Sequence, residues 1–151
     1  MIEYRNGDIF EQSDLGLIIH QANCMGVFGA GVAKTIKEKY PEAYMADQIC
    51  TLTPAKKLGY FTYAEYIDKT IVNMYSQLGF GSGKCYTDYI AMRDALIHIR
   101  NKFGYIPTHA VPYKIGCGLA GGDWDVVLGT LYRVYEQSKI RLVICRRGEL
   151  E

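Results

Sequence analysis

The chain has 151 residues, of which 49% are hydrophobic and 22% charged, and its formal net charge is +1. This length fits a single domain with a sizeable core. The near balance of charge excludes the broad basic surface of a general nucleic-acid binder. The five cysteines are scattered and form no C-x-x-C pair, which argues against a disulfide framework and a structural zinc site.

The N-terminal sequence and the hydropathy of the chain are used to predict where the protein is located. No apolar run reaches the ~18 residues of a membrane helix, and the N-terminus has no secretory signal pattern. We therefore expect a soluble, intracellular protein of the cytoplasm. One domain is expected over residues 1–149, followed by a vector-derived tail at 150–151.

The first half of the chain predicts strands and helices in alternation. The expected elements are a strand over 1–5, a turn at Asn6-Gly7-Asp8, a buried strand over 15–22, a helix over 31–40 with Val32, Ile36 and Tyr40 at four-residue spacing, a helical segment over 42–50, and two antiparallel strands over 58–66 and 70–75. The loop over 76–86 is rich in glycine.

The second half continues the alternation. Thr87 is predicted to cap a helix that ends at Gly104, with Ile90, Ala91, Ala95, Leu96 and Ile99 as its buried stripe. A strand over 106–113, a helix after Asp123 that buries Val127, Leu128, Leu131, Val134 and Tyr135, and a strand over 140–145 follow. His98 is expected to be a solvated or partly packed side chain, and His109 to have a structural role. The pattern predicts a three-layer α/β/α domain with a mixed, mostly parallel sheet.

A glycine-rich loop joins the strand over 15–22 to the next helix. Three glycines, Gly26, Gly29 and Gly31, let the backbone approach a ligand closely, and the helix that follows directs unpaired N–H groups into the loop. This arrangement favours an anion, most often a phosphate. The spacing matches neither standard nucleotide-binding pattern, which disfavours an NAD-dependent oxidoreductase.

A second glycine-rich loop, over 115–123, also lies between a predicted strand and a helix. Polar residues His20, Gln21 and Asn23 end the buried strand, where ligands bind in open α/β sheets. Two such loops can hold a diphosphate from both sides. Asp123 opens a helix, so it has a capping explanation as well as a catalytic one.

Four sequence blocks together resemble the macro domain family. They are Gly7-Asp8-Ile9-Phe10, the segment from His20 to Cys24 with Gly29-Ala30-Gly31-Val32-Ala33, the segment from Val72 to Gln77, and the segment from Tyr113 to Trp124. The resemblance spans nearly the whole chain. It is strongest to the branch that contains yeast-type ADP-ribose 1″-phosphate phosphatases and terminal ADP-ribose protein glycohydrolases.

The resemblance implies a role for each matching position. Asp8 would accept the adenine amino group beside the Ile9 backbone, and Asn23 would hold the distal ribose. The diphosphate and ribose would be enclosed by Gly29, Ala30, Gly31 and Val32 and by Ile115, Gly116, Cys117, Gly118 and Leu119, and Gln77 would also contact the ligand. His20 and Asp123 match the catalytic His and Asp of the phosphatases. The glycohydrolases that act on glutamate have a lysine at the place of Gln77 and an aspartate at the place of Ala120, so a lysine-adduct mechanism is disfavoured.

These roles predict a hydrolase that removes the 1″-phosphate from ADP-ribose 1″-phosphate. His20 and Asp123 would share the acid and base work, in an order that the sequence leaves open. We expect no metal and no cofactor, and we expect Cys24 and Cys117 to pack rather than to react. Two alternatives stay open: a hydrolase of ADP-ribosyl esters on protein or nucleic acid, and a non-enzymatic ADP-ribose reader in which His20 and Asp123 only pack and cap.

Overall fold

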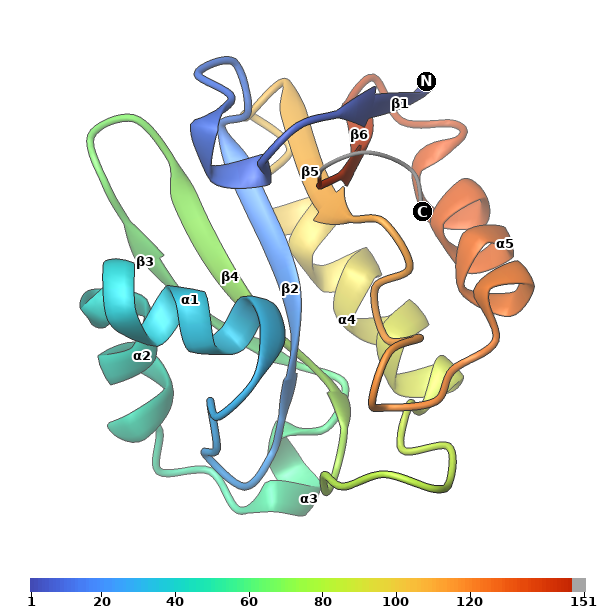
Figure 1. Cartoon of the computed structure of the whole chain (residues 1–151). Helices are drawn as coiled ribbons and strands as arrows, with labels where there is room; N and C mark the ends of the chain where they lie inside the picture. Colours follow the sequence, from blue (N-terminus) through green and yellow to red (C-terminus); the bar gives the residue numbers. More distant parts are fainter. Residues whose placement is uncertain (148–151) are drawn as a thin grey trace.

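The computed structural model describes residues 1–147 and contains one six-stranded sheet (Figure 1). The strands are β1 (Ile2–Asn6), β2 (Leu17–Asn23), β3 (Phe61–Glu65), β4 (Thr70–Gln77), β5 (Thr108–Pro112) and β6 (Arg141–Arg146). Their order is β1-β6-β5-β2-β4-β3, and all neighbours are parallel except β3 and β4. The predicted mixed, mostly parallel sheet is confirmed. The tail expected at 150–151 lies outside the described residues.

Helices cover both faces of this sheet. One face carries α1 (Gly31–Lys39) and α2 (Pro41–Gln48), and the other carries α4 (Tyr89–Lys102) and α5 (Trp124–Tyr135) (Figure 1). Two short elements, η1 (Ile9–Glu11) and α3 (Pro54–Lys57), were not predicted, because a single turn is too short to show a periodic pattern. No helix within residues 1–147 is long and apolar enough to cross a membrane.

The central strand β2 is buried on both faces, which explains its nearly continuous apolar sequence. Successive side chains of a strand point to opposite faces. Leu17 and Ile19 accordingly pack in the core under α4 and α5, whereas Ile18 and Ala22 pack under α1 and α2. The same alternation directs His20 and Gln21, which are adjacent in sequence, to opposite faces of the sheet.

The structure corrects the predicted start of α4. Asp88, rather than Thr87, is the N-cap, and its carboxylate accepts the Ala91 N–H at 2.9 Å. Ile90 is 64% exposed, and Met92 takes its place in the buried stripe. The reason is geometric, because each residue turns the helix by about 100°, so that Ile90 falls outside the face that carries the other predicted positions.

Candidate functional site

Three adjoining cavities follow the carboxyl ends of the parallel strands. The Asp8 cavity, of about 240 Å³, is lined by residues that include Asp8, Ile9, Gly31, Val32, Thr35 and Arg147. The Lys114 cavity, of about 260 Å³, is lined by His20, Gln21, residues 30–33 and most of the second glycine loop. The Phe80 cavity, of about 430 Å³, is lined by Asn23, Gly29, Gln77, Phe80, Leu119 and others. Neighbouring cavities share lining residues, so they form one continuous site.

The structure brings most of the predicted ligand-binding residues to this site. All of them line at least one of the three cavities except Cys117. The sequence did not single out Lys114, Arg147, Thr35 or Phe80, which also line the site. Two of these, Lys114 and Arg147, carry positive charge, but a single basic residue beside a strand end is common in sequences and gives no signal that would have found them.

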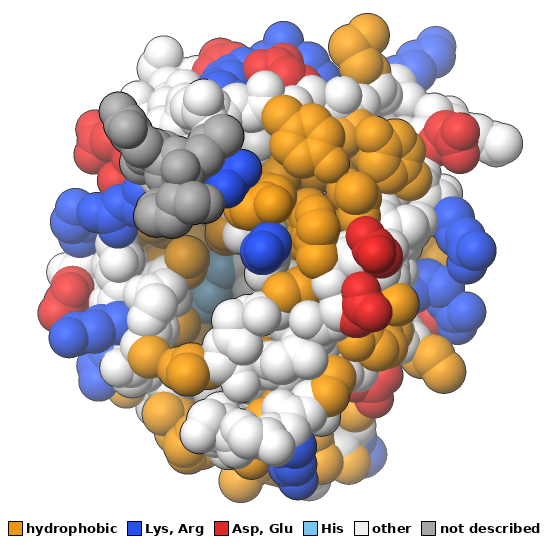
Figure 2. Space-filling model, turned by 45° about the vertical axis from the view of Figure 1, so that its right-hand side comes forward, with side chains coloured by type: hydrophobic (Ala, Val, Ile, Leu, Met, Phe, Trp, Pro, Cys, Tyr) orange, Lys and Arg blue, Asp and Glu red, His pale blue; other side chains and the backbone are white. Residues whose placement is uncertain are grey.

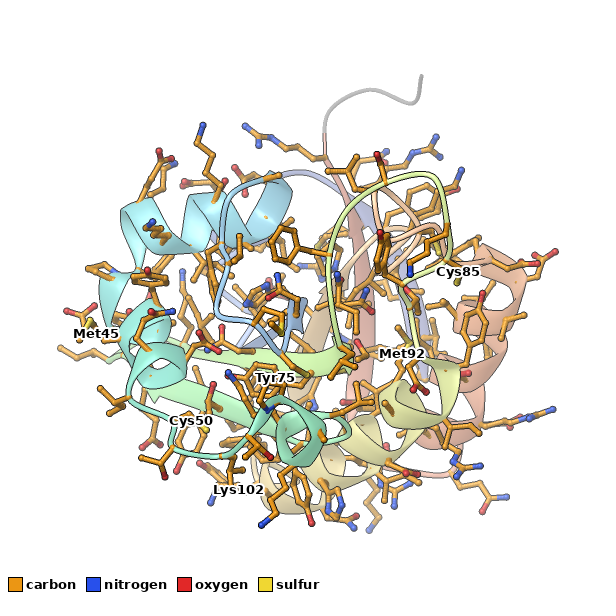
Figure 3. The ribbon with its side chains drawn as sticks, turned by 90° about the horizontal axis from the view of Figure 1, so that it is seen from below. Met45, Cys50, Tyr75, Cys85, Met92 and Lys102 are labelled. Carbon is orange, nitrogen blue, oxygen red and sulfur yellow. The ribbon has the colours of Figure 1, made fainter. Side chains whose placement is uncertain are left out.

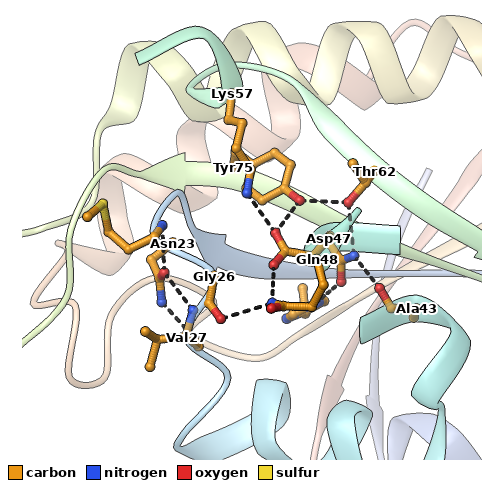
Figure 4. Close-up of polar contacts among 12 residues, drawn as sticks. Asn23, Gly26, Val27, Ala43, Asp47, Gln48, Lys57, Thr62 and Tyr75 are labelled. Atoms are coloured by element: carbon orange, nitrogen blue, oxygen red, sulfur yellow. Dashed lines mark hydrogen bonds and ion pairs between the residues drawn. The ribbon is translucent and has the colours of Figure 1, made fainter. Parts of the chain in front are cut away.

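The side chain of Asn23 organises the first glycine loop. Its Nδ2 donates to the Val27 carbonyl at 2.7 Å, and its Oδ1 accepts the N–H groups of Met25 and Val27 (Figure 4). The loop leads to Ala30, the N-cap of α1, which makes no side-chain hydrogen bond to the helix. The N–H groups of the first turn of α1 are therefore left for a ligand or solvent, and the helix dipole favours an anion there.

The second glycine loop can be formed only with glycine at particular positions. Gly116 has φ +76°, and a Cβ there would lie 2.8 Å from the Oε1 atom of Gln21. A Cβ on Gly122 would lie 2.5 Å from the Gly116 carbonyl oxygen. The loop thus packs its backbone directly against itself and against β2, as a close-fitting ligand cradle requires.

A hydrogen-bond network around Gln21 joins the two sides of the Phe80 cavity. Gln21 Nε2 donates to Gln77 Oε1 at 2.8 Å and to Thr87 Oγ1 at 3.0 Å, and Ser76 Oγ donates to Gln21 Oε1 at 2.6 Å. Thr87 in turn donates to the Gly116 carbonyl at 2.6 Å. The network holds β2, β4 and the second glycine loop in register. Gln77 therefore has a structural partner at the position where the resemblance placed a ligand contact.

His20 is 1% exposed and lies on the face of the sheet covered by α1 and α2. Its Nε2 is 2.6 Å from Asn73 Oδ1. The Asn73 amide donates through Nδ2 to the Ala43 carbonyl at 2.9 Å and to Thr62 Oγ1 at 3.0 Å, so its oxygen must face His20. This network assigns the proton of the neutral imidazole to Nε2. Nδ1 then carries a lone pair, and it has no hydrogen-bond partner within residues 1–147.

A buried polar relay continues from Asn73. The Thr62 hydroxyl lies 2.7 Å from the Tyr75 hydroxyl, which donates to Asp47 Oδ1 at 2.5 Å, and Lys57 Nζ donates to the same oxygen at 2.9 Å (Figure 4). Burial lowers the pKa of His20 to about 4, although the bond to Asn73 and the charge of Asp47 act in the opposite direction. At neutral pH the ring is therefore an uncharged base.

Asp123 is placed as a helix cap. It is the N-cap of α5, and its Oδ1 accepts the Asp125 N–H at 2.9 Å. The predicted capping explanation is confirmed. Asp123 lines none of the three cavities, and α5 covers the face of the sheet opposite to His20. The structure does not bring the two predicted catalytic side chains together.

The cysteines are free thiols in the described part of the chain. Cys50 and Cys85 lie well apart, and Cys85 belongs to the loop between β4 and α4 (Figure 3). Burial raises the pKa of both Cys24 and Cys117 to about 11, which disfavours a reactive thiolate. Within residues 1–147, no three His, Cys, Asp or Glu side chains are grouped so that they could hold a metal ion.

Together these features define an α/β domain with an anion-binding cleft between two glycine-rich loops. No family model matches the chain. It is 30% identical, over 95% of both chains, to an uncharacterized 17.5 kDa protein in the tk-vs intergenic region of Enterobacteria phage T4. It is 28% identical over 91% of its length to the DNA ADP-ribosyl glycohydrolase of Mycobacterium tuberculosis, of which it spans 39%. A shorter stretch of 38 residues is 50% identical to the ADP-ribose 1″-phosphate phosphatase of Aspergillus oryzae and covers 25% of this chain and 19% of that enzyme.

Solved structures of macrodomains also resemble this chain. The macrodomain of Mycobacterium tuberculosis DarG superposes with a TM-score of 0.77, at 26% identity and 99% coverage of both chains. Thermosipho africanus DarTG in complex with ADP-ribose superposes with a TM-score of 0.76, at 21% identity over 99% of this chain and 43% of that one. The chain belongs to the macro domain family.

Proposed function

We propose that this chain binds ADP-ribose or a derivative across the three cavities. Adenine lies in the Asp8 cavity, the diphosphate in the Lys114 cavity, and the distal ribose in the Phe80 cavity. The main support for this proposal is that the three cavities are continuous. The Lys114 cavity shares Gly31, Val32 and Pro112 with the Asp8 cavity, and it shares Gln21, Gln77 and Leu119, among others, with the Phe80 cavity.

The charges of the site suit a diphosphate. The unfilled N–H groups at the start of α1 lie on one side, and Lys114, directly before the second glycine loop, lies on the other. Arg147 lines the Asp8 cavity. Cations and N–H dipoles in a partly closed cleft stabilise phosphate oxygens more strongly than they would in open water. ADP-ribose in the DarTG complex and in the names of the related enzymes supports this choice of ligand.

For the reaction, we favour hydrolysis of ADP-ribose 1″-phosphate. Water attacks phosphorus and gives a proton to His20 Nδ1, the bond between phosphorus and the 1″-oxygen breaks, and that oxygen takes the proton from the imidazole. Two observations support this role: the lone pair on Nδ1 has no partner, and His20 lines the Lys114 cavity, which shares lining residues with the Phe80 cavity that holds the distal ribose. For Asp123 we propose a positioning role, since its cap anchors the end of the second glycine loop to α5.

Two other functions have observations in their favour. The similarity to the mycobacterial DNA ADP-ribosyl glycohydrolase spans 91% of this chain, which supports hydrolysis of an ADP-ribosyl bond on a macromolecule. A non-enzymatic reader is supported by the Phe80 cavity itself. Its described lining contains amides and a serine but no carboxylate or lysine, and Gln21 and Gln77 are occupied with each other.

Calorimetric titration with ADP-ribose, run beside phosphate release from ADP-ribose 1″-phosphate, separates these functions. A phosphatase binds and releases phosphate, and His20→Ala abolishes the release while ADP-ribose still binds. Binding without release, even at long incubation, would replace the phosphatase with the reader or the macromolecular hydrolase. The latter two differ in whether ADP-ribosylated protein or oligonucleotide is turned over. If no heat of binding is detected, the site assignment itself is wrong.

A further inference from the structure

Three polar side chains lie in one row across the neighbouring strands β2, β4 and β3. His20 pairs in register with Asn73, and Asn73 pairs in register with Thr62. The row two residues away on the same face is apolar and belongs to the core under α1 and α2; it consists of Ile18, Ile71 and Ala64. Apolar side chains therefore pack well in this layer, and burial of polar groups there is not needed for stability. The polar row needs another explanation.

The orientation of the Asn73 amide can be assigned from its partners. The Ala43 carbonyl can only accept a hydrogen bond, and it lies 2.9 Å from Asn73 Nδ2. An amide rotated by half a turn would place two acceptors against each other. Asn73 Oδ1 therefore faces His20 and accepts the proton of its Nε2 at 2.6 Å, while Nδ2 also donates to Thr62 Oγ1.

Beyond Asn73 the hydrogen bonds of the relay all run in one direction, toward the Asp47 carboxylate. The Tyr75 hydroxyl gives its single proton to Asp47 Oδ1, so it must accept the proton of the Thr62 hydroxyl. Lys57 Nζ lies 2.9 Å from the same carboxylate oxygen, and this pair is buried. Hydrogen bonds in such a chain polarise and strengthen one another. The relay thus holds the Asn73 amide in one orientation.

The other end of the relay is His20 Nδ1, which has no hydrogen-bond partner within residues 1–147. His20 lines the Lys114 cavity, and Figure 2 shows a histidine ring recessed in a hollow of the molecular surface. The Phe28 ring packs edge-on against the imidazole, with 5.6 Å between centroids. A neutral imidazole can carry its proton on either nitrogen, so its tautomer decides whether Nδ1 offers a ligand a donor or a lone pair.

We propose that Asn73 is a positioning residue for His20: it keeps the imidazole proton on Nε2, so that Nδ1 meets the ligand as a lone pair. The consequence for catalysis rests on the proposed function, because a base that takes a proton from water needs this lone pair. An amide suits this task better than a carboxylate. A negative charge beside Nε2 would favour the imidazolium, which has no lone pair.

Nitrogen NMR of the imidazole rings, on the ¹⁵N-labelled whole protein at neutral pH, tests the inference without substrate. Protonated and unprotonated ring nitrogens differ widely in chemical shift, and His20→Gln identifies the His20 signals. In the wild type we expect a proton on Nε2 and none on Nδ1. Asn73→Leu should mix the two tautomers, whereas Asn73→Asp should keep the proton on Nε2, because a carboxylate accepts it. His109 is the internal control, since its Nε2 faces the Phe103 carbonyl.

Phosphate release gives a second readout. Asn73→Leu should lower kcat by about tenfold or more and change KM by less than about twofold, because the base is misdirected while the cavities are kept. Tyr135→Phe is the matched control. Tyr135 is 0% exposed, and its hydroxyl lies 2.8 Å from Nδ1 of His109, a histidine that lines none of the three cavities. This variant also removes the partner of a buried histidine, and it should keep the kcat of the wild type.

Three results would overturn the inference: a proton on Nδ1 in the wild type, a single Nε2–H tautomer in folded Asn73→Leu, or an equal loss of kcat in Tyr135→Phe. If Asn73→Leu does not fold, the spectra of the wild type and of Asn73→Asp decide, and a proton that leaves Nε2 in Asn73→Asp contradicts the inference. If the wild type releases no phosphate, only the proposed reaction fails. The tautomer is measured without substrate, so the spectra still decide whether Asn73 holds it.

Discussion

Two buried histidines lie on the neighbouring strands β2 and β5 and are alike in most respects. His109 lies near the start of β5 and is 0% exposed, while His20 lies in the middle of β2 and is 1% exposed. Burial lowers the pKa of each to about 4. They differ in their hydrogen bonds. His109 uses both ring nitrogens, Nδ1 with the Tyr135 hydroxyl at 2.8 Å and Nε2 with the Phe103 carbonyl at 3.0 Å, whereas His20 uses only Nε2.

This difference shows which observation distinguishes a histidine of the hydrophobic core from a histidine of a functional site. Neither burial nor the lowered pKa distinguishes the two histidines, since both follow from removal of the ring from water. Unfilled hydrogen-bonding capacity does distinguish them. At the Lys114 cavity, His20 Nδ1 and the N–H groups at the start of α1 both lack partners in the described residues. In the core of a native protein, buried polar groups almost always have hydrogen-bond partners. Several unpartnered groups in one place therefore indicate a ligand-binding site.

The largest expected effect comes from substituting each of the two histidines in a separate variant. We expect His20→Gln to lower kcat for phosphate release by about 10²–10⁴-fold, the usual contribution of a general base. The matched variant His109→Gln should lose stability but keep the kcat of the wild type at temperatures where it is folded. Both are measured by steady-state phosphate release after circular dichroism has confirmed folding. Equal loss of kcat in the two variants would assign His20 to the core.

The polar relay behind His20 should contribute strongly to stability. Lys57→Met leaves the Asp47 carboxylate, which is 2% exposed, without its cation. We expect a loss of about 3–5 kcal/mol in the free energy of unfolding, measured in urea. The exposed pair of Arg93 with Asp94 is the control, and Arg93→Met should change stability by no more than about 1 kcal/mol. Similar losses in both variants would mean that the relay is not held as described.

Acid should weaken the fold through both histidines. Each has a folded-state pKa of about 4, below the value near 6.5 of an unfolded chain. Between these values the unfolded state binds more protons, so the contribution is complete above about pH 6.5 and is lost as pH falls toward 4. The loss is on the order of 3 kcal/mol for each histidine. Urea unfolding across this range should show it, and His109→Gln should have a shallower slope than the wild type. An unchanged slope would contradict the burial of a neutral His109.

The smallest expected effects come from replacing two glycines with alanine, one in the second glycine loop and one in α5. Gly116→Ala must keep a positive φ and place Cβ against Gln21 and Thr87, so we expect a loss of about 1–3 kcal/mol and weaker binding of ADP-ribose. Gly129 lies within α5, and a Cβ there meets no atom within 4 Å. Gly129→Ala should therefore raise stability by about 0.5–1 kcal/mol. Thermal unfolding and calorimetry measure both, and a Gly116→Ala protein with unchanged affinity would show that the second loop does not contact the ligand.

Much of the fold was predictable from local pattern. The apolar run that ends at Ile19, the four-residue spacing of α1 and the strand pair of β3 and β4 all reflect periodicities that adjacent residues impose on each other. The cap of α5 by Asp123 was equally local. The glycines of the two loops also marked the site, because positive φ and close backbone approach are properties of a single residue type.

The sequence by itself determined the elements, their class and the two loops that enclose the site. Only the tertiary structure decided what each polar side chain faces. His20 and Asp123 fell on opposite faces, Gln21 became the centre of a network, and Asn73 set the imidazole proton from 53 residues away. The physical reason is that hydrogen-bond partners here come from different strands and helices. Their pairing depends on sheet order and register, which no local pattern specifies.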